Sequence, residues 1–229
     1  MDYPAAELLA RIALFRNVPA SVLEDMSALS FRKRFAVGEA VLVQGEPAEA
    51  VYIVVMGRLR VTQTASDGQQ IILRYLGPGD VVGYAALASA QSQPGTVTVV
   101  DDTHLIGWPV ATFKTFMADN TPIALNAVDM LAKRYHDLQL RLLELSTEKV
   151  EQRIAHTILR LAGQAGRRTS RGIEIAFPLS RQDLAEMCGT TLHTVSRTLS
   201  GWEEQSIVDC GRRRVIVTKP DMLNAIANR

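Results

Sequence analysis

Seven apolar residues between positions 124 and 145 recur at alternating spacings of four and three residues. They are Ala124, Val128, Leu131, Tyr135, Leu138, Leu142 and Leu145. A 3.5-residue period requires a continuous helix, and a seam this narrow is typical of a helix that pairs with another helix. The spacing therefore predicts a long helix in a symmetric dimer, where each seam residue from Val128 to Leu145 meets an identical partner. Packing of the seam against the chain's own barrel is the alternative.

The residues before this helix have the pattern of a β-domain. From about residue 31 to 110, glycine- and proline-containing turns separate short β-rich runs. The runs are AVLVQ (40–44), AVYIVVM (50–56), RLRVTQT (58–64), QIILRYL (70–76), TVTVV (96–100) and HLIGW (104–108), and Gly57 is among the predicted turns. Regular short strands predict a compact barrel or jelly roll, and Asp67-Gly68 predicts a hairpin. Residues 4–30 predict short helices ahead of it.

After a hinge near Ser146-Thr147, the spacing of Ile154, Ile158 and Leu161 predicts a second helix that ends at Gly163 or Gly166. The polar stretch GRRTSRG (166–172) predicts a loop, and IEIAF (173–177) predicts a strand.

Two short helices with a glycine-containing turn are predicted between residues 180 and 204. Ser180 is placed to cap the first helix, with Asp183 completing a short capping box. Gly189 ends that helix, and Thr191 caps the next one. Two helices joined in this way predict a helix-turn-helix.

The second of these helices has distinct inner and outer faces. Its spacing turns Val195, Leu199 and Trp202 inward, and it turns His193, Ser196, Arg197 and Ser200 outward. The following stretch IVDCGRRRVIVTK (207–219) predicts a hairpin whose turn carries Arg212, Arg213 and Arg214 as a basic wing.

The distribution of charge agrees with a nucleic-acid module in the second half of the chain. Residues 1–146 carry 12 Lys and Arg against 15 Asp and Glu, a balance of −3, whereas residues 147–229 carry 13 against 9, a balance of +4. A basic C-terminal part favours a polyanionic partner such as nucleic acid.

These elements, in this order, resemble the cyclic-AMP receptor protein/fumarate-nitrate regulator (CRP/FNR) family of bacterial transcription regulators. The resemblance covers nearly the whole chain. Four stretches carry it: GEAVLVQGEPAEAVYIVVMGRLRV (38–61), LGPGDVVG (76–83), QRIAHTILRLA (152–162) and LSRQDLAEMCGTTLHTVSRTL (179–199). It implies an α+β fold class. An N-terminal cyclic-nucleotide-binding-like β-roll (jelly roll) with flanking helices occupies 1–119, a long dimerisation helix and hinge 120–147, and a winged helix-turn-helix DNA-binding domain 148–229.

The resemblance also implies a homodimer that bends a palindromic operator in double-stranded DNA and contacts RNA polymerase. An effector bound in or near the β-roll would reorient the long helices. The competing hypothesis is a ligand-binding module whose C-terminal domain has no DNA role.

The DNA contacts expected from this arrangement fall into two classes. Base contacts are assigned to Arg197, Ser196 and His193, and phosphate contacts to Arg181, Gln182, Thr190, Thr191, Arg212 and Arg213. Arg197 can meet guanine O6 and N7 bidentately. His193 stands where many relatives carry a glutamate, and a neutral imidazole has only one acceptor nitrogen. We therefore expect a palindrome of the TTG-N8-CAA type, with relaxed demand opposite His193.

The predicted sensor lacks the residues with which related proteins bind cyclic nucleotides. Tyr84 occupies the position of the ribose-binding carboxylate, and Pro94-Gly95 occupies that of the phosphate-binding Arg-Ser pair. No Arg or Lys occurs between Tyr75 and His104. A buried phosphate requires a cation or several N–H donors, so a cyclic nucleotide is not expected. An iron–sulfur cluster is not expected either, because the N-terminal part has no cysteine.

A mostly apolar effector pocket is expected instead, beside the long helix. Its residues are Tyr84, Ala85, Ala86, Leu87 and Ala88, with His104 nearby. The stretch GTTLHTVSRTL (189–199) most resembles the nitric-oxide-responsive denitrification (NnrR/DNR-type) branch of the family. That likeness implies haem as a cofactor, with His104 or His136 as the axial ligand. Another small apolar effector, or none, is the alternative.

Several classes of protein are not expected from this sequence. No nucleophile elbow, phosphate loop, metal triad or pair of catalytic carboxylates is present, so an enzyme is not expected. Cys188 and Cys210 form no CxxC motif, and Cys188 is expected to be a small buried residue, with a redox-sensitive thiol as the alternative. No segment approaches the roughly 20 apolar residues of a membrane span. We expect a soluble cytoplasmic protein without a membrane partner.

Overall fold

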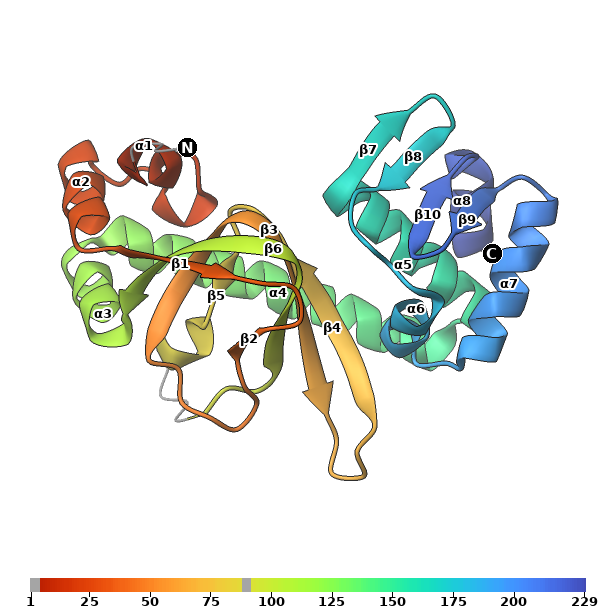
Figure 1. Cartoon of the computed structure of the whole chain (residues 1–229), viewed down its shortest axis with the longest axis horizontal. Helices are drawn as coiled ribbons and strands as arrows, with labels where there is room; N and C mark the ends of the chain where they lie inside the picture. The colour runs from red at the N-terminus through yellow and green to blue at the C-terminus, as the bar shows by residue number, and fades with distance from the viewer. Residues whose placement is uncertain (1–4, 88–91) are drawn as a thin grey trace. The chain divides into compact units, whose positions relative to one another are not determined.

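The computed structural model describes residues 5–87 and 92–229. The chain forms two compact units (Figure 1). The first contains the residues up to Asp67 together with Arg74–Leu138, and the second contains Gly68–Leu73 and Gln139–Arg229.

The first unit is a β-roll, as the sequence predicts. Its sheet contains β1 (Phe31–Phe35), β2 (Ala40–Leu42), β3 (Ala50–Thr64), β4 (Gln70–Leu76), β5 (Val81–Val82) and β6 (Thr96–Pro109). The strands lie in the order β1-β6-β3-β4, with β2 also paired to β6 and β5 to β3. A short 3-10 turn, η2 (Tyr84–Leu87), follows β5.

Helices pack on one side of this roll through aromatic side chains. They are α1 (Ala5–Ala10), the 3-10 turn η1 (Ala13–Phe15), α2 (Ala20–Ala28) and α3 (Val110–Asp119). Trp108 of β6 lies at ring-centroid distances of 6.3 Å from Phe15 and 5.7 Å from Phe113. Its indole nitrogen also donates to the carbonyl oxygen of Met26 at 2.7 Å. The short helices predicted at the N-terminus are therefore confirmed for the described residues, and Pro4 lies outside them.

Two predicted strand boundaries are wrong. The runs 50–56 and 58–64 form the single strand β3, and the runs 96–100 and 104–108 form the single strand β6. The pairing of β3 with β6 shifts register on both sides of Gly57, whose φ is +98°. Gly57 is thus a β-bulge and not a turn.

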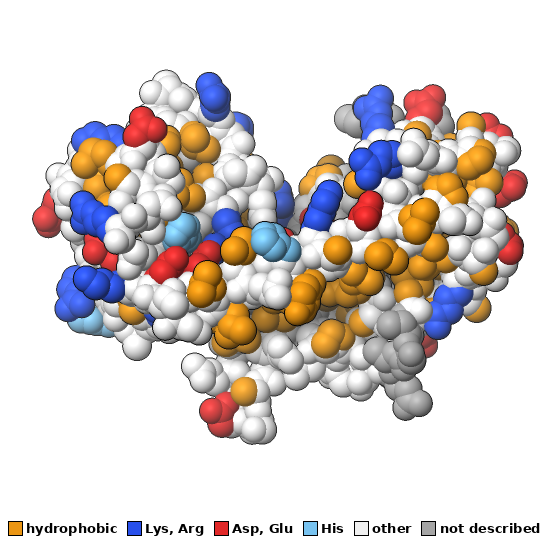
Figure 2. Space-filling model, turned by 180° about the vertical axis from the view of Figure 1, so that it is seen from behind, with side chains coloured by type: hydrophobic (Ala, Val, Ile, Leu, Met, Phe, Trp, Pro, Cys, Tyr) orange, Lys and Arg blue, Asp and Glu red, His pale blue; other side chains and the backbone are white. Residues whose placement is uncertain are grey.

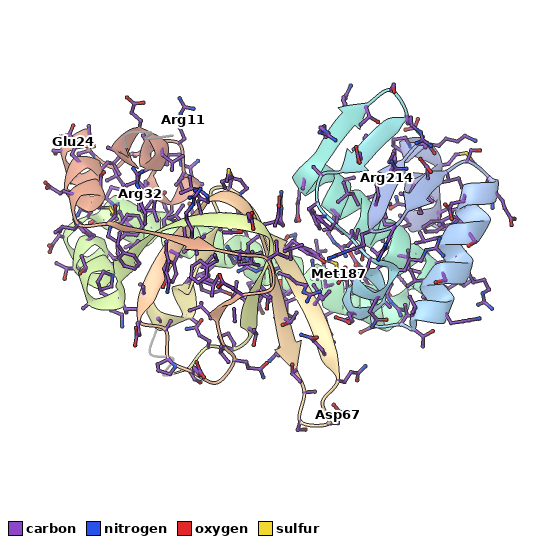
Figure 3. All side chains as sticks on the ribbon, viewed as in Figure 1. Arg11, Glu24, Arg32, Asp67, Met187 and Arg214 are labelled. Carbon is purple, nitrogen blue, oxygen red and sulfur yellow. The ribbon has the colours of Figure 1, made fainter. Side chains whose placement is uncertain are left out.

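The strand β1 is not predicted from the sequence, because most of its residues are charged. The segment FRKRF forms β1, in which only Phe35 is buried. Three consecutive charged residues do not give the alternation that predicts a strand. By contrast, the hairpin predicted at Asp67-Gly68 is confirmed, and Asp67 lies at its tip (Figure 3).

The long helix predicted from the heptad seam is present as α4 (Thr121–Thr147). At its start, Ile123 and Ala127 are buried in the core of the first unit. The seam residues from position 128 onward are exposed on the single chain: Val128, Leu131, Tyr135, Leu138, Leu142 and Leu145. Figure 2 shows hydrophobic side chains gathered along this helix.

The second unit contains α5 (Val150–Ala165), α6 (Arg181–Cys188), α7 (Leu192–Glu204) and α8 (Pro220–Ala227). Its sheet has the order β7-β8-β10-β9, formed by β7 (Gly166–Thr169), β8 (Gly172–Ile175), β9 (Val208–Gly211) and β10 (Arg214–Val217). None of the helices in the described part of the chain is long and apolar enough to cross a membrane.

The predicted polar loop at 166–172 is wrong in this unit. Gly166–Thr169 pairs with Gly172–Ile175 in an antiparallel hairpin, so the arginine-rich stretch is mostly a strand. The strand propensity of these residues is low, and the pairing depends on β8, which itself pairs with β10. The predicted wing hairpin is confirmed, although Arg214 belongs to β10 and not to the turn.

The bulge in β3 leads to a test of the β-roll. A Cβ at Gly57 would collide with the carbonyl oxygen of Asp102, whereas a Cβ at Gly68 would meet nothing within 4 Å. Both glycines have positive φ. A strained backbone and a steric overlap each cost about 1–3 kcal/mol. We expect Gly57→Ala to lower the free energy of unfolding by at least about 1 kcal/mol more than Gly68→Ala in urea denaturation. Equal losses would contradict the bulge.

Candidate functional site

Local hydrogen bonds cap the start of α6 and the start of α7, and Gly189 forms the turn between the two helices. Ser180 Oγ accepts a hydrogen bond from the Asp183 backbone nitrogen at 3.0 Å, and Asp183 Oδ2 accepts one from the Ser180 backbone nitrogen at 2.8 Å. Gly189 ends α6 in the left-handed conformation, with φ +59°. Thr191 Oγ1 then accepts from the Thr194 backbone nitrogen at 3.2 Å. The predicted capping box and both predicted helix ends are confirmed.

One face of α7 is buried against its own unit. Val195, Leu199 and Trp202 are at most 2% exposed, as their spacing predicts. The indole nitrogen of Trp202 donates to Glu151 Oε1 on α5 at 3.1 Å. The rotation of α7 about its axis is therefore fixed by burial and by one directed hydrogen bond.

The opposite face of α7 presents polar side chains to solvent. His193 and Arg197 are exposed and lie one helical turn apart, and Ser196 is half-buried beside them. Within residues 5–87 and 92–229, neither Arg197 nor His193 has a hydrogen-bond or ion-pair partner. An exposed guanidinium on a fixed helix can donate two parallel N–H bonds to a planar pair of acceptors.

The residues expected near the helix starts have partners within the chain. Arg181 Nη2 donates to Glu203 Oε2 at 3.2 Å, and Gln182 Nε2 donates to Glu186 Oε1 at 3.0 Å. Glu203 also accepts from the Cys210 backbone nitrogen at 3.1 Å. Arg181 therefore links α6, α7 and β9 on a single chain.

Thr190 and Thr191 lie in the turn that precedes α7. Thr190 is half-buried, and its backbone nitrogen donates to the Ala185 carbonyl oxygen at 3.0 Å. Thr191 is exposed, and its hydroxyl caps α7. The positive end of the helix dipole adds to the attraction of anions at this position.

The wing brings two further cations to the surface. Arg212 and Arg213 are exposed in the β9–β10 turn, where Arg213 has φ +59°. In the described part of the chain, neither guanidinium has an ion-pair partner. In contrast, Arg214 lies 3.7 Å from Asp209, and Arg171 also pairs with that carboxylate. The wing turn therefore carries two arginines that are available for an external anion.

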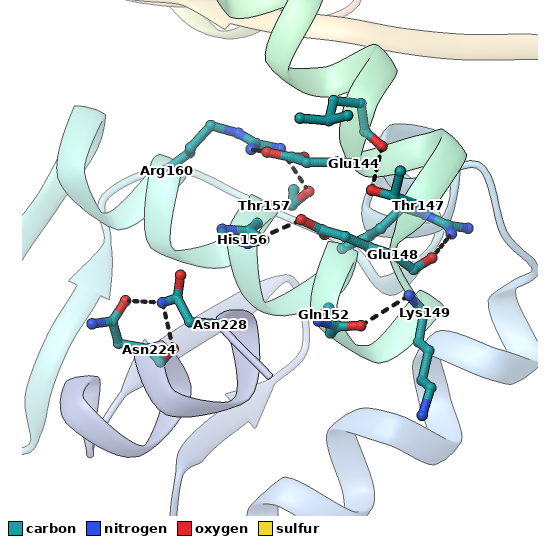
Figure 4. A network of polar contacts seen from close by, with 12 residues as sticks. Glu144, Thr147, Glu148, Lys149, Gln152, His156, Thr157, Arg160, Asn224 and Asn228 are labelled. Carbon is teal, nitrogen blue, oxygen red and sulfur yellow. Dashed lines mark hydrogen bonds and ion pairs between the residues drawn. The ribbon is translucent and has the colours of Figure 1, made fainter.

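A polar network connects α4 to α5 within the second unit (Figure 4). Arg160 donates to Glu144, and His156 Nε2 lies 3.3 Å from Glu148 Oε1. Arg153 donates to the carbonyl oxygen of Cys188 at 3.1 Å. These contacts link α5 to the end of α4, to Glu148 just after it and to the end of α6.

Cys188 is buried beneath this network, as predicted. Its thiol donates to Thr157 Oγ1 at 3.4 Å. Burial raises the pKa of the Cys188 thiol above its usual range. A protonated buried thiol reacts slowly with oxidants, which disfavours a redox role.

The expected sensor residues surround Tyr84 at η2. Tyr84, Ala85 and Leu87 are half-buried, Ala86 is buried, and Ala88 lies outside the described residues. The expectation of a mostly apolar environment is wrong at Tyr84 itself. The guanidinium carbon of Arg134 lies 5.0 Å from the Tyr84 ring centroid, and that of Arg74 lies 5.6 Å from it.

The sequence pattern does not predict these two arginines at Tyr84, because neither lies in the stretch between Tyr75 and His104 that contains it. Arg74 comes from β4, and Arg134 comes from α4. One signal was present in the sequence. Arg134 directly precedes the seam residue Tyr135, so it lies at the flank of the seam and can turn toward its own domain.

The position of the missing phosphate-binding pair is Pro94-Gly95, and its second residue leaves no room for a Cβ. A Cβ at Gly95 would lie 2.5 Å from the carbonyl oxygen of Thr62, so a serine at this position requires a backbone shift. The absence of cyclic nucleotide binding stays a prediction from the residues at Tyr84 and Pro94-Gly95.

The histidines expected as haem ligands lie in unsuitable surroundings. His104 is half-buried on β6, and its Nε2 accepts a hydrogen bond from Arg34 Nε at 2.8 Å. His136 is exposed on α4. An axial ligand must project a free nitrogen toward the iron. Ligation of haem by His104 would therefore need its other ring nitrogen or the loss of the Arg34 contact. Within residues 5–87 and 92–229, no three His, Cys, Asp or Glu side chains gather as a metal site.

Comparison with known proteins matches two separate parts of the chain to two domain families. Residues 32–120 match the cyclic nucleotide-binding domain family, and residues 152–226 match the Crp-like helix-turn-helix domain family. The chain is 30% identical over 204 residues to the cyclic AMP receptor protein of Thermus thermophilus, covering 89% of this chain and 91% of that protein.

Two further similarities extend along most of the chain. The CRP-like cAMP-activated global transcriptional regulator of Mycobacterium tuberculosis is 22% identical over 217 residues, covering 95% of this chain and 97% of that protein. The solved structure of FixK2 from Bradyrhizobium japonicum superposes with a TM-score of 0.76 at 26% identity, covering 86% of this chain and 96% of that one.

Proposed function

Since the chain belongs to the CRP/FNR family of DNA-binding transcription regulators, we propose that it acts as a homodimer on a palindromic operator. Proteins of this family bind DNA and commonly act as dimers. The observation that carries the proposal is α7, with one face buried and an exposed His193–Arg197 face free of internal partners. In a symmetric dimer, two such helices enter the major groove about one helical turn of DNA apart.

Arg197 and His193 on the exposed face of α7 favour different hydrogen-bonding groups on the DNA bases. Arg197 donates to guanine O6 and N7, a contact worth about 1–3 kcal/mol of discrimination. His193 can offer one acceptor nitrogen, or none when it is protonated. A site of the TTG-N8-CAA type meets both requirements. Arg212 and Arg213 attract the phosphate backbone without regard to sequence. RNA polymerase is the proposed partner once the operator is bound.

A base-substitution scan of one operator half-site tests this assignment. We expect replacement of the guanine read by Arg197 to lower affinity by roughly 5- to 150-fold, and replacement of the pair opposite His193 to have a smaller effect. His193→Glu should restore demand for cytosine at that pair, because a carboxylate accepts from cytosine N4. Fluorescence anisotropy at one fixed salt concentration measures each affinity.

Two results would contradict the assignment. One is equal demand at both positions in the wild type, and the other is an unchanged base preference in Arg197→Ala. Arg213→Ala serves as the control for a phosphate contact, since it should weaken all sequences alike and reduce the salt dependence.

The proposed dimer buries the α4 seam. The six seam residues are between 45% and 66% exposed on the single chain. Burial of one leucine side chain contributes about 1.5–3 kcal/mol, so a seam of this length can hold two chains together. The seam defines a parallel pairing in which each residue meets its own copy.

Substitutions at two adjacent leucines test the seam. Leu142 is 66% exposed and belongs to the seam, whereas Leu143 is 58% exposed and does not. We expect Leu142→Glu to give a monomer at micromolar concentration with at least a tenfold loss of operator affinity, because it places like charges at the paired position. Leu143→Glu should remain dimeric. Sedimentation velocity measures the oligomeric state of both variants. A dimeric Leu142→Glu would contradict the seam assignment.

The N-terminal unit is proposed as the sensor that controls DNA affinity. Nitric oxide acting through haem is the signal that the likeness to the denitrification branch favours, and it stays a prediction, as does the absence of cyclic nucleotide binding. The alternative is another small apolar effector, or none.

The absorption spectrum tests haem sensing directly. Protein produced with haem available and kept reduced is expected to show a Soret band that shifts on addition of nitric oxide. No Soret band under these conditions would exclude haem. Cyclic AMP, added to the operator-binding assay, should leave the affinity unchanged, and an increase would contradict the expectation drawn from Tyr84 and Pro94-Gly95.

A further inference from the structure

A histidine lies on the α7 face that is proposed to contact bases, and both of its ring nitrogens are available there. His193 is exposed in the first turn of α7, and no side chain or backbone group of residues 5–87 and 92–229 bonds to its imidazole. By contrast, His104 accepts a hydrogen bond from an arginine, and His156 lies 3.3 Å from a glutamate oxygen. The hydrogen-bonding character of His193 is therefore left to the solvent and to the DNA.

The charged side chains of the elements around His193 are engaged elsewhere. On α7 itself the nearest charged residue along the exposed face is Arg197, one turn away. The turn before α7 contributes only threonines, and the wing turn contributes two exposed arginines. The charged residues of α6, and those of α5 and β9 that lie toward α7, have partners of their own: Arg181 with Glu203, Asp183 with Ser180, Glu186 with Gln182, Glu151 with Trp202 and Asp209 with Arg171.

The two protonation states of an imidazole recognise different bases. A neutral imidazole has one acceptor nitrogen, which fits the N4 amino group of cytosine. A protonated imidazole has two donors and no acceptor, which fits N7 and O6 of guanine. Adenine presents an acceptor beside a donor, so it fits either state. An ordinary imidazole changes state at about pH 6.5, whereas a glutamate remains an acceptor throughout the neutral range.

We propose that the protonation of His193 decides which base pair α7 prefers at one operator position, so that the choice of operator follows pH. The neutral form favours cytosine, and the protonated form favours guanine. This inference rests on the proposed function and deepens it, because it divides the relaxed demand opposite His193 into two opposite demands. Arg197 keeps its preference at every pH in this range, since a guanidinium stays charged.

Operator binding at two pH values tests the inference. Fluorescence anisotropy of the full-length protein is measured at about pH 6 and about pH 8, at one fixed ionic strength, on operators with cytosine, guanine or adenine opposite His193. Roughly three quarters of an ordinary imidazole is protonated at the lower pH and a few per cent at the higher. From high to low pH, we expect the affinity ratio of guanine to cytosine to rise at least about fivefold. Adenine should lie between the two.

Two variants and one internal control identify the titrating group. His193→Gln keeps both a donor and an acceptor at every pH, so its base preference should not change with pH. His136→Gln removes an exposed histidine of α4 and should keep the wild-type change. Operators varied at the guanine read by Arg197 should give the same affinity ratio at both pH values. A change that persists in His193→Gln would overturn the proposal.

Proton exchange on binding provides a second measurement. Calorimetry near pH 7 in two buffers with different ionisation enthalpies gives the number of protons bound or released with each operator. We expect net uptake with the guanine operator relative to the cytosine operator, because only the former selects the cation. The difference should vanish in His193→Gln. Equal proton numbers for both operators in the wild type would overturn the proposal.

Failure of this inference can be told apart from failure of the proposed function. If the wild type binds the operator with the same base preference at both pH values, the pH dependence is overturned and the DNA-binding function stands. If the chain binds no operator at either pH, the proposed function and this inference are both overturned.

Discussion

In the described part of the chain the apolar seam of α4 is exposed, and the proposed recognition of an operator depends on how that seam is covered. Hydrophobic burial is non-directional, but a 3.5-residue period admits only a narrow set of partners, of which a second copy in register is the simplest. A single α7 can contact one half-site. In the proposed dimer, pairing of α4 would join two half-site contacts in one molecule, so the proposed affinity for a palindrome rests on the seam as well as on Arg197.

The orientation of α7 is defined by several local contacts. Caps at Ser180 and Thr191, the buried face of α7 and the Trp202–Glu151 hydrogen bond fix the direction in which Arg197 points. The contact of Arg160 with Glu144 joins α5 to the end of α4, and the contact of Arg153 with Cys188 joins α5 to the end of α6.

In the sensor region, the local sequence pattern does not predict contacts between distant segments. No Arg or Lys occurs between residues 75 and 104, yet Arg74 and Arg134 lie over Tyr84, and Arg134 is 50 residues away from it in the chain. In the same way, Gly57 has the appearance of a turn but is a bulge within β3, because pairing with β6 continues on both sides of it. Both errors concern contacts between segments that are distant in the sequence.

The sequence by itself determined the order of the elements, the length and seam of α4, both caps of the helix-turn-helix and the outward face of α7. Each of these depends on residues a few positions apart, where helical periodicity and capping chemistry act. Only the tertiary structure decided that β3 and β6 are continuous, that the arginine-rich stretch at 166–172 is a hairpin and that two guanidinium groups surround Tyr84. Strand pairing and the burial of charge are set by which distant segments meet, and no local pattern encodes that meeting.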